Sequence, residues 1–132
     1  MPDTKHARLL LSIARRDLQA SSHMLNPSDF PEEAFGFHAQ QAVEKALKAW
    51  VCLKGITYPW EHDLEQLFQL LEDAGEKGAT EFRDLIGLTD FAARLRYDYS
   101  DDEPLDREET VRRVAAIVGL VAGEIDRVDP GQ

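Results

Sequence analysis

The sequence predicts an all-α fold, an up-and-down antiparallel bundle of four long helices and one shorter helix. Three observations predict it. Apolar residues recur at steps of three and four along five separate segments. Clusters rich in Pro, Gly, Asn and Asp separate these segments by short connections. No segment has the regular alternation of apolar and polar residues that predicts a strand.

The first helix is expected over residues 4–25, and the turn-forming residues 26–29, Asn-Pro-Ser-Asp, should end it. Its apolar residues follow steps of three and four, with charged and amide residues between them. The apolar set is Ala7, Leu11, Ala14, Leu18 and Leu25, and the polar set is Arg15, Arg16, Asp17 and Gln19.

The second helix is expected from Pro31 to about Lys54, with Gly55 as its C-terminal stop. At about 100° per residue, two opposite faces form. The apolar face holds Ala39, Val43, Ala46, Trp50 and Leu53. The opposite face, here termed the polar strip, holds His38, Gln41, Glu44, Lys45 and Lys48. Two interpretations are open. The strip is either a solvated helix face, or a surface that recognises something polar, such as a nucleotide or a partner helix.

The third helix is expected to begin near His62 and to end at residues 75–78. Its apolar stripe is Leu64, Leu67, Phe68 and Leu71. A fourth helix should begin at Thr80, which suits an N-cap, and fray at residues 97–102 in an acidic loop. Its apolar residues are Phe82, Leu85, Leu88, Ala92 and Leu95.

The fifth helix should begin at Asp106, because Glu109 three residues later completes a pattern like a capping box. A heptad-like seam follows, formed by Val111, Val114, Val118, Val121, Ile125 and Val128. Ala115, Ile117 and Leu120 widen the apolar surface beyond one face. Such a helix either lies centrally in the bundle or also contacts a second subunit.

Length and composition limit the function classes. The 132 residues are expected to form one domain over 1–132. A net charge of −10 argues against binding of bulk nucleic acid, which needs clustered Lys and Arg. The lone Cys52 excludes an intrachain disulfide and fits a reducing cytoplasm, where we expect the protein. No signal peptide is expected, and the uncharged, apolar run of residues 114–123 is too short to span a bilayer.

Residues 37–49, Phe-His-Ala-Gln-Gln-Ala-Val-Glu-Lys-Ala-Leu-Lys-Ala, resemble the signature helix of the HEPN family (higher eukaryotes and prokaryotes nucleotide-binding domain). Two further segments resemble the same family in the same order: His62-Asp63-Leu64 and residues 93–97, Ala-Arg-Leu-Arg-Tyr. The resemblance extends from about Ala14 to Ile125.

The resemblance implies a helical bundle that commonly forms a homodimer. Many small prokaryotic members are encoded beside a minimal nucleotidyltransferase, as a toxin–antitoxin-like pair. Some members are metal-independent ribonucleases, and others are thought to bind nucleotides or to act as scaffolds. These properties are expectations for this chain.

The ribonuclease members use an Arg-x4–6-His motif late in the fourth helix, where Arg can hold the phosphate and His can move the 2′-hydroxyl proton. Here no His follows Arg94, since the last His is His62. Tyr99 stands five residues after Arg94, but a phenol with a pKa near 10 is a poor base at pH 7. Arg16 and His23 match the spacing by chance in the first helix. We therefore predict that the chain alone has no ribonuclease activity.

The candidate ligand-binding residues come from two segments. Gln41, Lys45 and Lys48 can contact a nucleotide, and Arg94 or Arg96 with Tyr97 can add charge and a stacking face. The alternative is that these groups satisfy one another, with Glu44 and Lys48 as an i,i+4 ion pair. That interpretation is favoured.

The remaining candidates are weaker. His62 is either a ligand contact or, as we favour, the cap of the third helix, and the role of His38 is open. We expect no metal and no cofactor, because the four His are scattered and form no ligand spacing. Cys52 is expected to be a packed thiol.

Three functions are compatible with these residues. The first is a non-catalytic, dimeric HEPN subunit that works with a nucleotidyltransferase and grips its nucleotide. The alternative is a ribonuclease toxin whose degenerate site is completed across a dimer, with Arg94, Arg96 and Tyr99 of two chains converging. In the third, the partner enzyme modifies Tyr97 or Tyr99.

Overall fold

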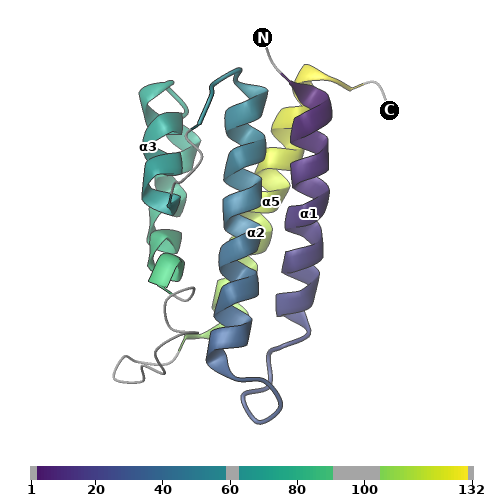
Figure 1. The fold of residues 1–132 in the computed structure, drawn as a ribbon, viewed down its shortest axis with the longest axis vertical. Coiled ribbons are helices and arrows are strands. Elements are labelled where there is room, and N and C mark those ends of the chain that lie inside the picture. The colour runs from purple at the N-terminus through teal and green to yellow at the C-terminus, as the bar shows by residue number, and fades with distance from the viewer. Residues whose placement is uncertain (1–2, 59–62, 91–104, 131–132) are drawn as a thin grey trace.

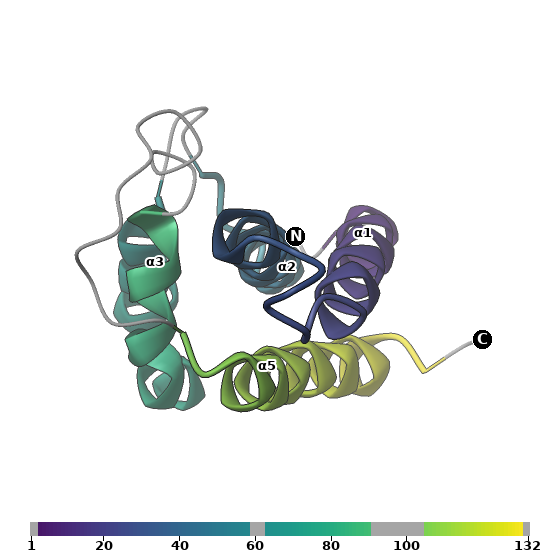
Figure 2. The ribbon, with the colours of Figure 1, turned by 90° about the horizontal axis from the view of Figure 1, so that it is seen from below.

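The computed structural model describes residues 3–58, 63–90 and 105–130, and every regular element in these ranges is helical. The order is α1 (Thr4–Ser22), α2 (Glu32–Leu53), α3 (Leu64–Asp73), η1 (Lys77–Asp90) and α5 (Arg107–Val128). Helices α1, α2 and α5 run along the length of the molecule, and α3 with η1 forms the remaining side (Figures 1 and 2). The all-α bundle predicted from the sequence is confirmed.

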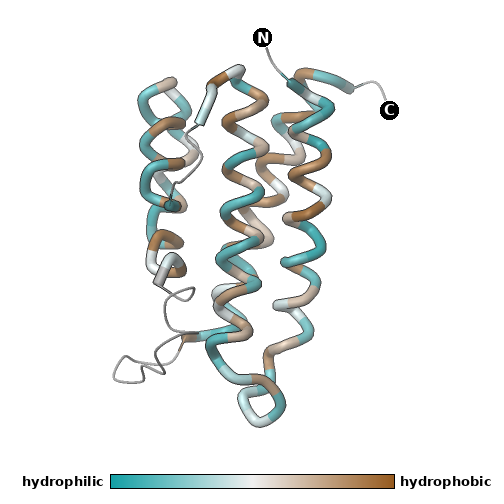
Figure 3. Tube along the Cα trace, in the orientation of Figure 1, coloured by the Kyte–Doolittle hydropathy of each residue, from teal (hydrophilic) through white to brown (hydrophobic). Residues whose placement is uncertain are grey.

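Helix α2 is the central element, since it packs against α1, α3, η1 and α5. The five residues predicted for its apolar face are all buried. Apolar residues alternate with polar ones along each helix in Figure 3, as expected when one side of every helix faces a shared core. The largest fully buried side chains include Phe35, Leu47, Leu53, Leu67, Phe68, Val114, Ile117 and Ile125.

The ends of α1 and α2 lie close to the predicted positions. The Asp3 carboxylate accepts a hydrogen bond of 3.0 Å from the His6 backbone N–H and caps α1, which ends at Ser22 rather than at residue 25. Helix α2 follows Pro31, and Gly55 stops it with a φ of 74°, a left-handed conformation that glycine adopts at low cost.

The cap of α3 is Asp63, which corrects the prediction that His62 caps this helix. The Asp63 carboxylate accepts a hydrogen bond of 2.9 Å from the Gln66 backbone N–H. The Gln66 side-chain oxygen in turn accepts from the Asp63 N–H at 3.1 Å, which completes a capping box. A carboxylate satisfies the first turn of a helix better than an imidazole does. His62 itself lies outside the described residues.

The fourth element is a 3₁₀ helix, where the sequence pattern predicted an α-helix from Thr80. Its buried residues are Ala79, Phe82, Leu85 and Leu88, spaced at every third position. A 3₁₀ helix has three residues per turn, so this spacing places all four side chains on one line facing the core. Thr80 does not act as a cap, because its hydroxyl donates to the Glu72 carboxylate at 3.0 Å. Ala92 and Leu95 lie outside the described residues.

Helix α5 begins as predicted, with the Asp106 carboxylate accepting a hydrogen bond of 3.0 Å from the Glu109 N–H. Most of the predicted seam is buried, but Val128 at its end is 47% exposed. The three residues predicted to widen its apolar surface differ in exposure: Ile117 is buried, whereas Ala115 and Leu120 face solvent. No helix in the described ranges is long and apolar enough to cross a membrane.

Candidate functional site

The polar strip lies along the middle of α2, and its side chains are more enclosed than a solvated helix face would be. The exposed fraction is 13% for the Lys48 side chain, 16% for Glu44 and 23% for Lys45. His38 is 33% exposed. These groups therefore need polar partners within the molecule or in a ligand.

Glu44 is the hub of the strip. Its carboxylate accepts hydrogen bonds from the Lys48 ammonium at 2.8 Å and from the Gln40 amide at 3.0 Å. The Lys45 ammonium lies 3.6 Å from the same carboxylate. The Gln41 amide donates to the Gln40 side-chain oxygen at 2.8 Å. The strip is thus one connected network, and the i,i+4 ion pair predicted between Glu44 and Lys48 is present.

Gln40 is a member of this network that sequence reasoning missed. It is 6% exposed, and it lies four residues before Glu44, as Lys48 lies four residues after it. Side chains four residues apart are neighbours on a helix. The same spacing rule that identified Lys48 also identifies Gln40.

The electrostatic balance of the strip favours an ionised Glu44. Burial works against the charge of this carboxylate, but hydrogen bonds from Lys48 and Gln40 and the charges of Lys48 and Lys45 outweigh burial. The pKa of Glu44 is therefore lowered from its ordinary value. Two lysines against one glutamate leave this part of the strip with a single net positive charge, in a chain of net charge −10.

His38 belongs to a different contact. Its Nδ1 lies 3.1 Å from the Asp17 carboxylate on α1, and both side chains are half-buried. Its ring also meets Phe37 edge to face, with the ring centroids 5.6 Å apart. The structure therefore assigns His38 to the α1–α2 contact and places it apart from the Glu44 network.

The C-terminal end of the network continues into the loop after α2. The Lys48 ammonium lies 5.6 Å from the centre of the Tyr58 ring, within the range of a cation–π contact. The Tyr58 hydroxyl and the Cys52 thiol are joined by a hydrogen bond, and burial raises the pKa of both groups. Cys52 is a partly buried, protonated thiol, which agrees with the prediction of a packed cysteine.

Two grooves among the described residues are lined by side chains outside the polar strip. A groove of about 310 Å³ lies beside Cys52 and Tyr58, at the end of α2. Its lining is Asp3, His6, Cys52, Gly55, Ile56, Thr57 and Tyr58.

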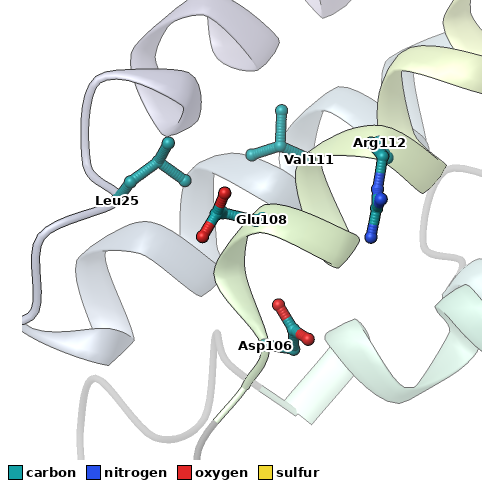
Figure 4. A pocket seen from close by; sticks show the side chains of 5 residues that line it. All are labelled: Leu25, Asp106, Glu108, Val111 and Arg112. Carbon is teal, nitrogen blue, oxygen red and sulfur yellow. The ribbon is translucent and has the colours of Figure 1, made fainter.

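The other groove, of about 370 Å³, lies where α5 begins (Figure 4). Leu25 and Val111 form its apolar side, and the carboxylates of Asp106 and Glu108 dominate its polar side. Its one cation, Arg112, is paired with Glu109. An acidic groove of this kind is a poor site for a phosphate.

The remaining candidate residues belong to two other segments of the chain. His62, Arg94, Arg96, Tyr97 and Tyr99 all lie outside the described residues. In the ranges that are described, no group of three or more His, Cys, Asp or Glu side chains is arranged to hold a metal ion.

Comparison with known proteins gives one family and one curated relative. The family described as "HEPN domain" matches residues 7–125. A Methanocaldococcus jannaschii protein named "Putative toxin MJ1304" is 37% identical over 54 residues, which are 41% of this chain and 34% of that protein. The chain thus matches about a third of that relative's length. No solved structure matches.

Proposed function

Because the chain belongs to the HEPN family, we propose that it is a non-catalytic subunit of a toxin–antitoxin-like pair, which binds a nucleotide through the polar strip of α2. Its partner in this proposal is a minimal nucleotidyltransferase, and the subunit is a homodimer. The similarity to a relative named "Putative toxin MJ1304" supports the toxin–antitoxin setting.

The observation that carries the non-catalytic assignment is the missing histidine. The family's ribonuclease motif has four to six residues between an Arg and a His, and no His follows Arg94. Among the described histidines, His38 is paired with Asp17 on α1. Without a base near neutral pH, the 2′-hydroxyl of RNA is not activated.

The geometry of the strip supports Lys45 as the principal phosphate contact. Lys48 is held at 2.8 Å by Glu44, whereas Lys45 lies 3.6 Å from the same carboxylate and is the more exposed of the two. The Lys45 ammonium can therefore turn toward an incoming phosphate at lower cost. The Gln41 amide, next to it on the helix, can read a ribose or base edge.

Calorimetric titration with ATP tests the nucleotide site. The wild-type protein should bind, and Lys45→Met should weaken binding by about tenfold, equivalent to one charge-assisted hydrogen bond. Glu44→Gln should tighten binding, because it removes the carboxylate that competes with the phosphate. Lys77→Met, at an exposed lysine on η1, is the matched control and should bind like the wild type. Absence of binding in the wild type, with and without the nucleotidyltransferase, would overturn the proposal.

A second assay addresses the alternative, a ribonuclease toxin completed across a dimer. Purified protein incubated with RNA should leave it intact. Cleavage that disappears in Arg94→Ala would establish the enzyme instead. The third possibility, modification of Tyr97 or Tyr99 by the partner, predicts an added nucleotide mass after co-expression with the nucleotidyltransferase.

A further inference from the structure

We propose that the solvent-facing side of α5 is the surface on which a second copy of this chain packs, with the two α5 helices antiparallel and crossing at Gly119. This inference deepens the homodimer in the proposed function by naming its interface.

The outer side of α5 lacks charge over its central three turns. Residues 114–123 contain no charged side chain, although 30% of the whole chain is charged. Its solvent-facing members are Ala115, Ala116, Gly119, Leu120 and Gly123. Leu120 is one of the exposed large apolar side chains, at 37%. A surface helix usually carries charged or polar residues here, so this face lacks the pattern of a solvated one.

Gly119 and Gly123 are not explained by packing within the chain. A Cβ atom built on either glycine meets nothing within 4 Å, and the positive-φ glycines of the described residues are Gly55 and Gly75 instead. Glycine inside a helix costs about 1 kcal/mol relative to alanine. Two such residues, four apart on the outer face, make a flat surface that lets the backbone of another helix approach closely.

The charges at the two ends of this face are complementary to those of a second, antiparallel copy. Arg112 lies seven residues before Gly119, and Asp126 lies seven residues after it. Their side chains are 73% and 69% exposed, and each also has a partner within the chain, Glu109 for Arg112 and Arg8 for Asp126. When two α5 helices cross antiparallel at Gly119, Arg112 of one copy lies toward Asp126 of the other, and the pairing occurs twice by symmetry.

In the same antiparallel register, the small residues of one helix face the small residues of the other. Ala115 then faces Gly123, and Gly119 faces Gly119, so no bulky side chain separates the two helices at the crossing. A parallel arrangement would instead place Arg112 against Arg112, and it would align the two helix dipoles unfavourably. The face is thus complementary to itself in the antiparallel direction, which commits the proposal to a second copy rather than to an unrelated helix.

Analytical ultracentrifugation of three proteins tests this surface. The wild type should be a dimer at micromolar concentration. Gly119→Gln should weaken dimerisation by about tenfold or more, because a long side chain separates the crossing helices. The same substitution should leave the thermal unfolding midpoint of the monomer unchanged or higher, since Gln favours a helix more than Gly does. Loss of the dimer in this variant is therefore distinguishable from misfolding.

Gly87→Gln is the matched control, since a Cβ at Gly87 on η1 also meets nothing within 4 Å. It should dimerise like the wild type. Arg112→Glu and Asp126→Arg should each weaken the dimer a few-fold, and the double variant should restore it. A monomeric wild type, or a Gly119→Gln protein that dimerises normally, would overturn the proposal. The ATP titration is a separate readout, so loss of this interface alone leaves the nucleotide site standing, and the reverse also holds.

Discussion

The Lys48 ammonium lies 2.8 Å from the Glu44 carboxylate one turn earlier on α2, and at most 16% of either side chain is exposed. An ion pair on an open helix surface contributes little to stability. This pair is enclosed and shares its carboxylate with Gln40 and Lys45. Removal of either charge therefore leaves the other poorly solvated.

Glu44→Gln should lower the free energy of unfolding by about 1–3 kcal/mol, because Lys48 loses a charge-assisted hydrogen bond and stays enclosed. Urea denaturation measures this change. Glu65→Gln is the control, since Glu65 is exposed in the first turn of α3, and it should change stability by a few tenths of a kcal/mol. Equal effects of the two substitutions would show that the contacts of Glu44 with its neighbours on α2 do not stabilise the fold.

Acid should weaken the fold through Glu44 and Glu76. Burial disfavours both charges, but lysine hydrogen bonds outweigh it, so both pKa values lie below the ordinary 4.5. A carboxyl with a lowered folded-state pKa adds stability above its unfolded pKa and loses it as pH falls through the folded value. The stability gap between wild type and Glu44→Gln should thus be full above about pH 5 and shrink below pH 4.5. A gap independent of pH from 3 to 7 would show that ionisation of Glu44 does not matter.

Trp50 joins α2 to the turn before η1. The indole N–H donates to the Glu76 carboxylate at 2.9 Å, and Lys54 approaches the same group at 3.0 Å. Trp50→Phe removes this hydrogen bond and part of a buried ring, so it should cost about 1–3 kcal/mol in urea denaturation. Lys54→Met, which removes the more exposed partner, should cost less. The opposite ranking would mean that the ion pair, not the indole, holds this turn.

Arg113 holds η1 against α5. Its guanidinium donates to the Asp84 carboxylate and to the Glu81 carbonyl, both at 2.7 Å, and lies 4.8 Å from the centre of the Phe82 ring. Arg113→Lys keeps the charge but cannot make these contacts together, so it should cost about 1 kcal/mol. The neighbouring Arg112→Lys, measured at a protein concentration too low for the proposed dimer, should have almost no effect. A neutral Arg113→Lys would contradict this role.

The local signals in the sequence predicted the bundle well. Gly55 and Asp106 marked helix ends correctly, and the i,i+4 spacing found the Glu44–Lys48 pair. At the start of α3 the sequence predicts the wrong neighbour, since the cap is Asp63 and not His62. The 3₁₀ geometry of η1 was also overlooked, although the three-residue spacing from Ala79 to Leu88 indicates it.

The long-range contacts could not be predicted in the same way. Asp17 and His38 are 21 residues apart, and no local rule pairs them. The link from Lys48 through Tyr58 to Cys52 depends on how the loop folds back after α2. Such contacts follow from the packing of whole helices, so only the structure reveals them.

Backbone amide chemical-shift mapping by NMR during addition of ATP tests the polar strip most directly. We predict saturable shifts concentrated on α2 between Gln41 and Lys48, which need about tenfold more ATP in Lys45→Met and are unchanged in Lys77→Met. Shifts concentrated instead at the Cys52–Tyr58 groove or the acidic groove beside Asp106, or no shifts at millimolar ATP, would contradict it.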